Sequence, residues 1–179
     1  MKGAAVASRA RRLLPAAWLG WMLCLAAVGA PSAFALLARA DAGRVVARML
    51  AAEAYSSLAF GLLLLVLERL AARHAVLRGQ GRQFSPGMML SLGALFCTVA
   101  GYFALLPLME QARAGQGAFG FGQLHATSAV FFGFKVLLVA ALAWRGSAPV
   151  VVPGLTPTAA AMTASRAGRV ASPTPTPFS

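Results

Sequence analysis

Acidic residues are scarce in this chain, which has four Asp and Glu against 16 Lys and Arg and a formal net charge of +12. Charged residues of both signs make up 11% of its 179 residues, whereas a soluble globular domain has about 25%. This deficit excludes an ordinary water-soluble domain. Hydrophobic residues make up 59% of the sequence, which excludes a wholly disordered chain. The composition therefore indicates an integral membrane protein.

The sequence also lacks the usual signatures of catalysis and metal binding. Its two cysteines, Cys24 and Cys97, lie within apolar runs and lack the CxxC spacing of a zinc or redox site. No nucleophile and base pair, paired catalytic carboxylates or phosphate-binding glycine loop is recognisable. Basic residues are not interleaved with aromatic ones as in a nucleic-acid groove. We therefore predict no enzymatic activity, no cofactor, no metal site and no nucleic-acid partner.

Four long apolar runs dominate the remaining sequence. Each has the roughly 20 residues that a helix needs to cross about 30 Å of hydrocarbon, and backbone groups in lipid must bond internally. The predicted fold class is all-α, a polytopic membrane protein with a four-transmembrane-helix bundle at 14–145 and spans at 14–38, 45–67, 87–109 and 121–144. A basic N-tail (1–13) precedes the bundle. A Pro/Thr/Ser/Ala-rich tail (146–179) follows and is predicted to be disordered, either simply solvated or docking a partner.

The first apolar run has a second interpretation, as a cleaved signal peptide. Basic residues precede it, and Ala33-Phe34-Ala35 has the small-x-small pattern of a cleavage site. The run continues past that site to Ala38, which is too long for a typical signal peptide. We therefore favour a retained span.

Basic residues flank the four spans asymmetrically. One side carries eleven of them: Lys2, Arg9, Arg11, Arg12, Arg69, Arg73, Arg78, Arg82, Arg145, Arg166 and Arg169. The other side carries four: Arg39, Arg44, Arg48 and Arg113. Because Lys and Arg concentrate in cytoplasmic loops, both termini are predicted to face the cytoplasm, in a bacterial inner membrane. The lipid bilayer is the expected partner, and a homo-oligomer is left open because four spans rarely make a complete carrier.

Six polar side chains within the spans form the candidate ligand or ion cluster: Glu53, Tyr55, Tyr102, His125, Ser128 and Lys135. At about 1.5 Å per residue, Glu53 is expected about 12 Å and Lys135 about 20 Å from the outer, periplasmic end. A charge facing lipid is unfavourable by several kcal/mol, so these faces should point inward. Three interpretations of Glu53 and Lys135 remain open: a polar cavity or ion path, a structural ion pair, or a lysine that snorkels alone.

Small residues and prolines are expected to shape the helices. Gly93, Cys97 and Gly101 repeat every four residues in the third span, which permits close helix packing. Pro31 and Pro107 lie near the outer ends of the first and third spans and are expected to shape their helices. Pro107 frees a backbone carbonyl near Phe103, which either accompanies a simple kink, the favoured interpretation, or binds an ion. This correspondence hints at two tandem helical hairpins, although no residue-by-residue repeat is recognisable.

Two pairs of sequence stretches carry motifs in a recognisable order. One is WLGWMLCLAAVGAPSAFALL followed by DAGRVVARML, and the stronger is GYFALLPLMEQARAG followed by FGQLHATSAVFFGFKVLLVAALAWR. Both resemble a bacterial membrane family of unknown function that includes relatives of eukaryotic transmembrane protein 205. The elements shared with that family are Pro31, Phe34, Ala42, Gly43, Tyr102, Pro107, Leu124, His125 and Ser128.

The resemblance covers about residues 15 to 145 and implies the four-helix architecture more than an activity. One departure from the family concerns the position a few residues after Ser128, where the family favours an uncharged polar residue. This chain has Phe132 and Gly133 there, followed by Lys135.

Three functional hypotheses follow from these residues. The first is a small membrane protein that binds or moves a small solute or ion through the polar cluster. The second is a structural or accessory membrane subunit whose polar residues serve helix packing. The third is a metal- or haem-linked redox protein centred on His125, which is otherwise interpreted as a helix-end interfacial residue or a proton or metal site.

Overall fold

A computed structural model describes residues 2–79 and 84–147 of the chain, with side chains from Ala5 onward. The regular elements of these residues are all helical, which confirms the all-α fold class. The predicted C-terminal tail lies outside the described residues except for Gly146 and Ser147, which belong to the last helix.

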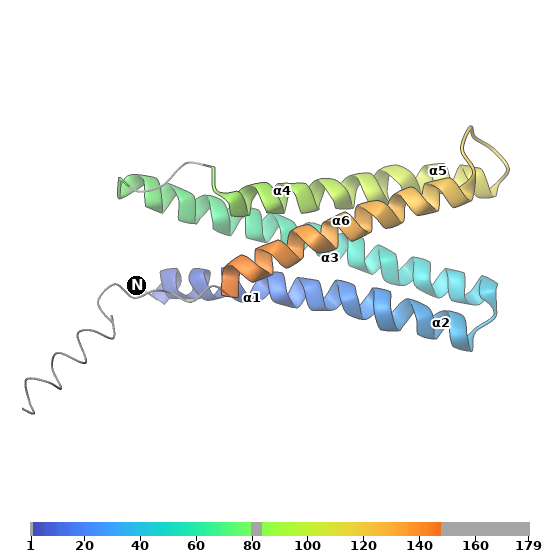
Figure 1. The fold of residues 1–179 in the computed structure, drawn as a ribbon, viewed down its shortest axis with the longest axis horizontal. Coiled ribbons are helices and arrows are strands. Elements are labelled where there is room, and N and C mark those ends of the chain that lie inside the picture. Colours follow the sequence, from blue (N-terminus) through green and yellow to red (C-terminus); the bar gives the residue numbers. More distant parts are fainter. Residues whose placement is uncertain (1, 80–83, 148–179) are drawn as a thin grey trace, which may run out of the picture. The chain divides into compact units, whose positions relative to one another are not determined.

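Four helical rods make up the described part of the chain (Figure 1). The first rod consists of α1 (Lys2–Cys24), the π-helix η1 (Leu25–Gly29) and α2 (Ala30–Leu36). The second is α3 (Arg39–Leu77). The third consists of α4 (Pro86–Thr98), the π-helix η2 (Val99–Ala104) and α5 (Leu105–Arg113), and the fourth is α6 (Phe121–Ser147). All four are long and apolar enough to cross a membrane.

The rods extend beyond the apolar runs from which the spans were predicted. The basic N-tail is helical from Lys2, and α3 begins at Arg39 and ends at Leu77, whereas the predicted span covers 45–67. At about 1.5 Å per residue, α3 is about 58 Å long, well above the 30 Å or so of a hydrocarbon core. Charged residues can continue a helix beyond the hydrocarbon core because their side chains are solvated by water there.

Local sequence signals explain where the rods start and turn. Pro86 occupies the start of α4, where its missing N–H is not needed, and the Ser85 hydroxyl accepts a hydrogen bond from the Met88 N–H at 3.2 Å. Leu37 is extended (φ −117°, ψ 154°) and ends α2 before α3 begins. Gly115 and Gly117 have positive φ of 73° and 111° in the loop before α6, a conformation that favours glycine.

The rods form a ring in which each contacts two neighbours. α1 packs against α3 and α6, and α4 packs against the same two helices, so α3 and α6 lie diagonally across the bundle. The centre of the apolar core is formed by five buried residues, one or two from each rod: Trp18, Met22, Leu64, Ala94 and Val139. This arrangement brings one face of α3 opposite one face of α6 in the interior.

The bundle consists of two similar helical hairpins. In each, the first rod is interrupted by a π-helix shortly before a proline, Pro31 in one and Pro107 in the other. Four buried positions in each of the two first rods have the same spacing: Pro15, Trp18, Met22 and Leu25 in α1 and η1, and Ser91, Ala94, Thr98 and Gly101 in α4 and η2. The repeat is therefore carried by burial and helix geometry rather than by residue identity.

The second rods of the two hairpins correspond in the same way. Buried residues of α3 match buried residues of α6 at equal distances from the first residue of each helix: Ala42, Glu53 and Ser57 correspond to Leu124, Lys135 and Val139. The hairpin contacts are also equivalent, since α1 packs against α6 as α4 packs against α3. Glu53 and Lys135 therefore occupy equivalent positions in the two repeats.

Candidate functional site

Glu53 and Lys135 form an ion pair inside the bundle. The Lys135 Nζ lies 2.8 Å from both Oε1 and Oε2 of Glu53, and each residue is 3% exposed. Glu53 comes from α3 and Lys135 from α6, so the pair joins the two diagonal helices. Of the three sequence interpretations, a lysine that snorkels alone does not fit this geometry.

The two residues meet because they lie at the same height. Each is the fifteenth residue of its helix, about 21 Å along the axis from the first residue. The expected difference of about 8 Å in depth arose from counting Glu53 from Val45, whereas α3 begins six residues earlier, at Arg39. Lys135 also lies one residue past the middle of the 27-residue helix α6, so the pair lies near mid-depth of the bundle rather than in its outer half.

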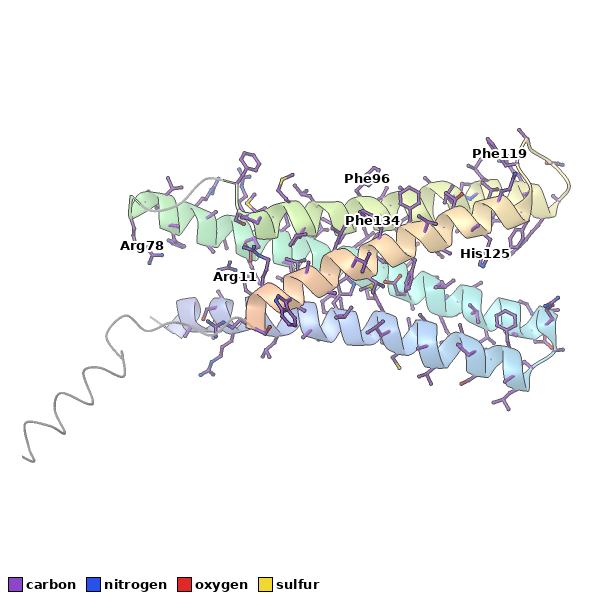
Figure 2. The ribbon with its side chains drawn as sticks, viewed as in Figure 1. Arg11, Arg78, Phe96, Phe119, His125 and Phe134 are labelled. Atoms are coloured by element: carbon purple, nitrogen blue, oxygen red, sulfur yellow. The ribbon has the colours of Figure 1, made fainter. Side chains whose placement is uncertain are left out.

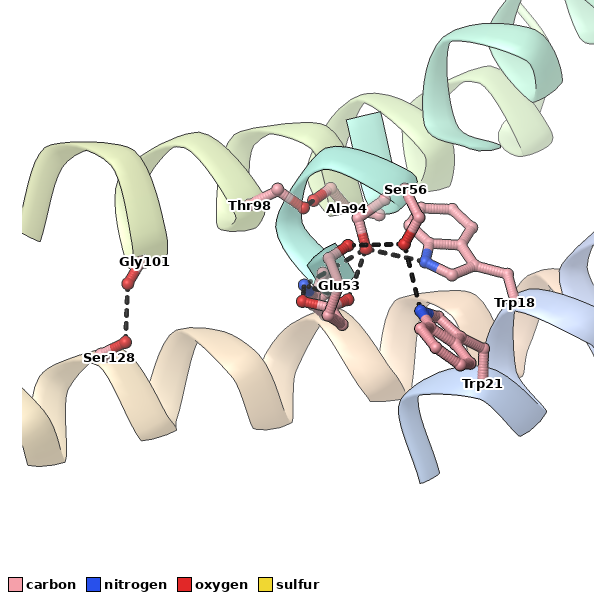
Figure 3. A network of polar contacts seen from close by, with 10 residues as sticks. Trp18, Trp21, Glu53, Ser56, Ala94, Thr98, Gly101 and Ser128 are labelled. Carbon is pink, nitrogen blue, oxygen red and sulfur yellow. Dashed lines mark hydrogen bonds and ion pairs between the residues drawn. The ribbon is translucent and has the colours of Figure 1, made fainter. Parts of the chain in front are cut away.

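Ser57 links the carboxylate to Trp18, and Figure 3 shows Trp18 near Glu53 in this network of polar contacts. The Ser57 hydroxyl donates a hydrogen bond to Glu53 Oε1. It accepts one from the Trp18 indole at 2.9 Å and a longer one from Lys135 Nζ at 3.4 Å. The Trp18 ring stacks on Phe60 at a centroid distance of 6.0 Å. The pair is therefore held by three of the four rods, because Trp18 belongs to α1.

The energetic balance of this pair depends on its hydrogen bonds. Removing two charges from water is unfavourable by several kcal/mol per ion, and attraction compensates only when geometry and remaining hydrogen bonds are good. Both carboxylate oxygens are bonded here, one of them twice. Loss of either partner would leave the other charge unpaired in a low-dielectric interior, so the pair favours one arrangement of α3 against α6.

Ser128 satisfies a backbone carbonyl of the π-helix η2. Its hydroxyl donates to the Gly101 carbonyl at 2.6 Å (Figure 3). Within the third rod, Thr98 donates to the Ala94 carbonyl at 2.9 Å. A π-helix disturbs the regular pairing of an α-helix, and a side chain from a neighbouring helix can bond the carbonyl that is freed. Ser128 thus fastens α6 to the interrupted rod.

Tyr55 and Tyr102 lie away from the ion pair. Both rings make edge-to-face contacts with Phe103, at centroid distances of 5.4 and 5.1 Å. Tyr55 is 64% exposed on the outer face of α3, although it is only two residues from buried Glu53. A step of two residues turns a helix by about 200°, which places the two side chains on opposite faces.

His125 is also separate from the pair. It is exposed near the start of α6, and its ring stacks on that of Phe121 at a centroid distance of 5.9 Å. The Arg113 guanidinium carbon lies over the Phe121 ring, 4.6 Å from its centroid. Figure 2 shows His125 near the end of the bundle opposite Arg11. In the described part of the chain, no three His, Cys, Asp or Glu side chains gather into a metal-binding group. The six predicted residues therefore form separate contacts rather than one polar cavity.

A depression on the outer face of α4 and α6 is apolar, unlike the polar cavity considered from the sequence. Its volume is about 360 Å³, and it is lined by apolar residues: Gly93, Phe96, Cys97, Val130, Phe131, Phe134 and Leu138. Figure 2 shows Phe96 and Phe134 on this side of the bundle. Such a surface suits acyl chains better than an ion.

The glycines of the third rod lie where α4 and η2 approach α6. A Cβ on Gly101 would come within 2.6 Å of the Phe131 Cβ, and a Cβ on Gly93 within 3.0 Å of a Leu138 methyl carbon. Cys97, between them, is buried. This close approach fits the interpretation that the small residues repeating every four positions in the third span serve helix packing.

Comparison with known proteins identifies the family to which this chain belongs. Residues 13–118 match a family described as a domain of unknown function (DUF4149). The chain belongs to the DUF4149 family. No curated protein and no solved structure gives a significant match. The matched DUF4149 segment contains Trp18, Glu53 and Ser57, whereas Lys135 lies beyond it.

A second buried carboxylate of this DUF4149 chain was not identified from its sequence. Glu68, 9% exposed, pairs with Arg11 Nε at 2.7 Å and accepts a hydrogen bond from the Ser85 hydroxyl at 2.9 Å. A Cβ on Gly87 would come within 2.5 Å of the Glu68 carboxylate. The missed signal was spacing: Glu53, Ser57, Gly61, Leu64 and Glu68 follow each other at three or four residues and share one helix face.

Proposed function

We propose that this membrane protein binds or moves a small ion or solute at the Glu53–Lys135 pair, where its two helical hairpins meet. The supporting observation is a pair of opposite charges, each 3% exposed, joined across the diagonal of an apolar bundle. Ionisable residues at such depth are rare in membrane proteins and mark ion or substrate paths.

The repeat architecture supports the same proposal. Many transporters consist of two structural repeats, with the binding site near the bilayer midplane at the repeat interface and with interrupted helices around it. Here Glu53 and Lys135 come from equivalent positions of the two hairpins. Both hairpins contain a π-helix, a feature frequent at functional sites.

The described arrangement corresponds to a closed state of such a site. Each charge is the counter-ion of the other, so a cation must compete with Lys135 for the Glu53 carboxylate, and an anion must compete with Glu53 for the Lys135 ammonium. Ser57 remains bonded to the carboxylate while Lys135 departs. Separation of the pair releases the only ion pair between α3 and α6 in the described residues, which loosens one hairpin from the other.

The experiment is ion flux into proteoliposomes, with H⁺, Na⁺, K⁺ and Cl⁻ tested separately, together with melting temperatures in each salt. We expect one ion to cross or to shift the melting temperature, and Glu53→Gln to remove that response. Glu110→Gln is the matched control, because Glu110 is an exposed acid near the end of α5. A wild-type protein without any ion response would refute this proposal.

A structural or accessory membrane subunit is the second candidate. The observation favouring it is that the pair is closed and fully hydrogen-bonded. A Glu53→Leu/Lys135→Leu double variant separates the two functions. If this double variant keeps its stability but loses the ion response, the result supports the ion site. If the double variant is fully functional in cells, the result supports the accessory role.

Several finer features belong to the same proposal. We propose a protein of the transmembrane protein 205-like type without enzymatic activity, in a bacterial inner membrane with both termini cytoplasmic. The basic asymmetry and the Leu124, His125 and Ser128 motif support these points. The redox alternative has less support, because His125 is exposed and stacked on Phe121.

A further inference from the structure

One end of the bundle is strongly basic. Seven arginines with described side chains lie near the start of α1 and the ends of α3 and α6: Arg9, Arg11, Arg12, Arg69, Arg73, Arg78 and Arg145. The Arg11–Glu68 pair joins α1 to α3 there, and Gly146 of α6 lies against the backbone of Arg12. These contacts hold α1 against both α3 and α6 at this end of the bundle.

The chain cannot neutralise this charge with its own side chains. It has four acids in total. Glu68 is the one at this end and is bound to Arg11. Asp41 and Glu110 lie toward the opposite end, on the first turn of α3 and in α5, and Glu53 is paired in the middle. The compensating anions must therefore come from outside the protein's side chains.

Two of these arginines lie at the height of lipid headgroups. Arg145 follows Lys135 by ten residues, or about 15 Å along α6, which is half of a hydrocarbon core of about 30 Å. A Cβ on Gly146 would lie 3.3 Å from the Arg12 Cα, so Arg12 is at the same height on α1. With the ion pair at mid-depth, both guanidinium groups reach the phosphate layer.

Exposed apolar side chains accompany these two arginines. Leu13 is 67% exposed next to Arg12, and Trp144 is 82% exposed next to Arg145. A soluble polyanion would leave both apolar groups in water. A phospholipid covers both kinds of group at once, because its phosphate pairs with guanidinium and its acyl chains contact leucine and indole.

We propose that Arg12 and Arg145 bind the headgroup phosphate of an anionic phospholipid at the contact of α1 with α6, with Leu13 and Trp144 against its acyl chains. Basic sites between membrane helices recognise anionic headgroups in this way. The site is distinct from the Glu53–Lys135 pair, and its occupancy does not depend on ion transport by that pair.

The test uses the full chain, purified in neutral detergent and titrated with phosphatidylglycerol, cardiolipin or phosphatidylcholine. Native mass spectrometry counts the lipids retained, and melting temperature reports stabilisation. We expect retention and a higher melting temperature with the two anionic lipids and neither effect with phosphatidylcholine. Equal retention of all three lipids would overturn the proposal.

Paired variants locate the site. Arg12→Gln/Arg145→Gln should weaken anionic lipid retention at least tenfold, and Arg12→Lys/Arg145→Lys should retain most of it. Arg39→Gln/Arg48→Gln removes two exposed arginines from the opposite half of α3 and is the matched control. An equal loss in the control would show a general charge effect and would overturn this site.

Inorganic phosphate and inositol hexakisphosphate distinguish the source of the anion. Neither should displace the lipid or raise the melting temperature as phosphatidylglycerol does. If a soluble phosphate stabilises the protein equally and Arg12→Gln/Arg145→Gln abolishes that effect, the ligand is a soluble anion and the lipid assignment is wrong.

Discussion

The indole Nε1 of Trp18 donates a 2.9 Å hydrogen bond to the hydroxyl of Ser57, which in turn donates to Glu53. This contact fastens α1 to an ion pair formed by two other helices. It also gives the buried tryptophan, which is 0% exposed, a partner for its polar atom.

Glu53 and Lys135 should depend on each other for stability. Glu53→Gln and Lys135→Met should each lower the free energy of unfolding by roughly 3–5 kcal/mol, because each strands a buried charge or polar group, and the double variant should recover part of the loss. A double-mutant cycle on thermal stability in detergent measures the coupling. Asp41→Asn is the control, since the Asp41–Arg44 pair is largely exposed and should contribute about 0–1 kcal/mol. Strictly additive losses would contradict the pair.

Trp18→Phe should lower stability by about 1 kcal/mol or somewhat more, because it keeps an aromatic ring against Phe60 but removes the donor to Ser57. Trp21→Phe is the matched control. Trp21 also donates to a serine, Ser56, at 3.1 Å, but it is 40% exposed. Equal effects of the two variants would show that the Ser57 bond adds nothing to the ion pair.

Gly101→Ala should destabilise the bundle by about 1–3 kcal/mol, because its Cβ would lie 2.6 Å from the Phe131 Cβ and force α6 away from η2. Gly133→Ala, on α6, is the comparison, since a Cβ there meets nothing within 4 Å. That change should be neutral or slightly stabilising, because alanine favours helix over glycine. Melting temperatures that fall equally would indicate no close approach at Gly101.

The first rod should be retained in the mature protein. Cleavage after Ala35 would remove Trp18 and Met22, both 0% exposed, and with them the donor to Ser57. Intact-mass measurement of the membrane-extracted chain should give the full-length mass. A product lighter by about 3.5 kDa would instead identify a cleaved signal peptide.

Reporter fusions should place the two short connections on the outer side. Fusions after Arg39 and after Gly115 are expected to read periplasmic, and a fusion at Arg78 cytoplasmic, because basic residues concentrate at the Arg78 end of the bundle. A periplasmic reading at Arg78 would reverse the predicted orientation.

The sequence by itself determined the helical class and the four membrane-length rods, since apolar run length and scarcity of charge depend only on composition and order. It also singled out Glu53 and Lys135, because any ionisable residue within an apolar run is conspicuous. It did not reveal Glu68, which looks like an ordinary charge at the end of an apolar run until Arg11 and Ser85 are brought to it.

Only the tertiary structure decided which polar residues meet. Tyr55 and His125 were predicted in one cluster with Glu53, yet Tyr55 is exposed and contacts Phe103, and His125 stacks on Phe121 near the start of α6. The repeat of the two hairpins was likewise hidden, because burial spacing and π-helices carry it while residue identities differ. The spacing of residues along one helix can be counted from sequence, but the residue at which α3 begins is seen only in the structure. The face that a side chain presents to its neighbours likewise depends on how the helices pack.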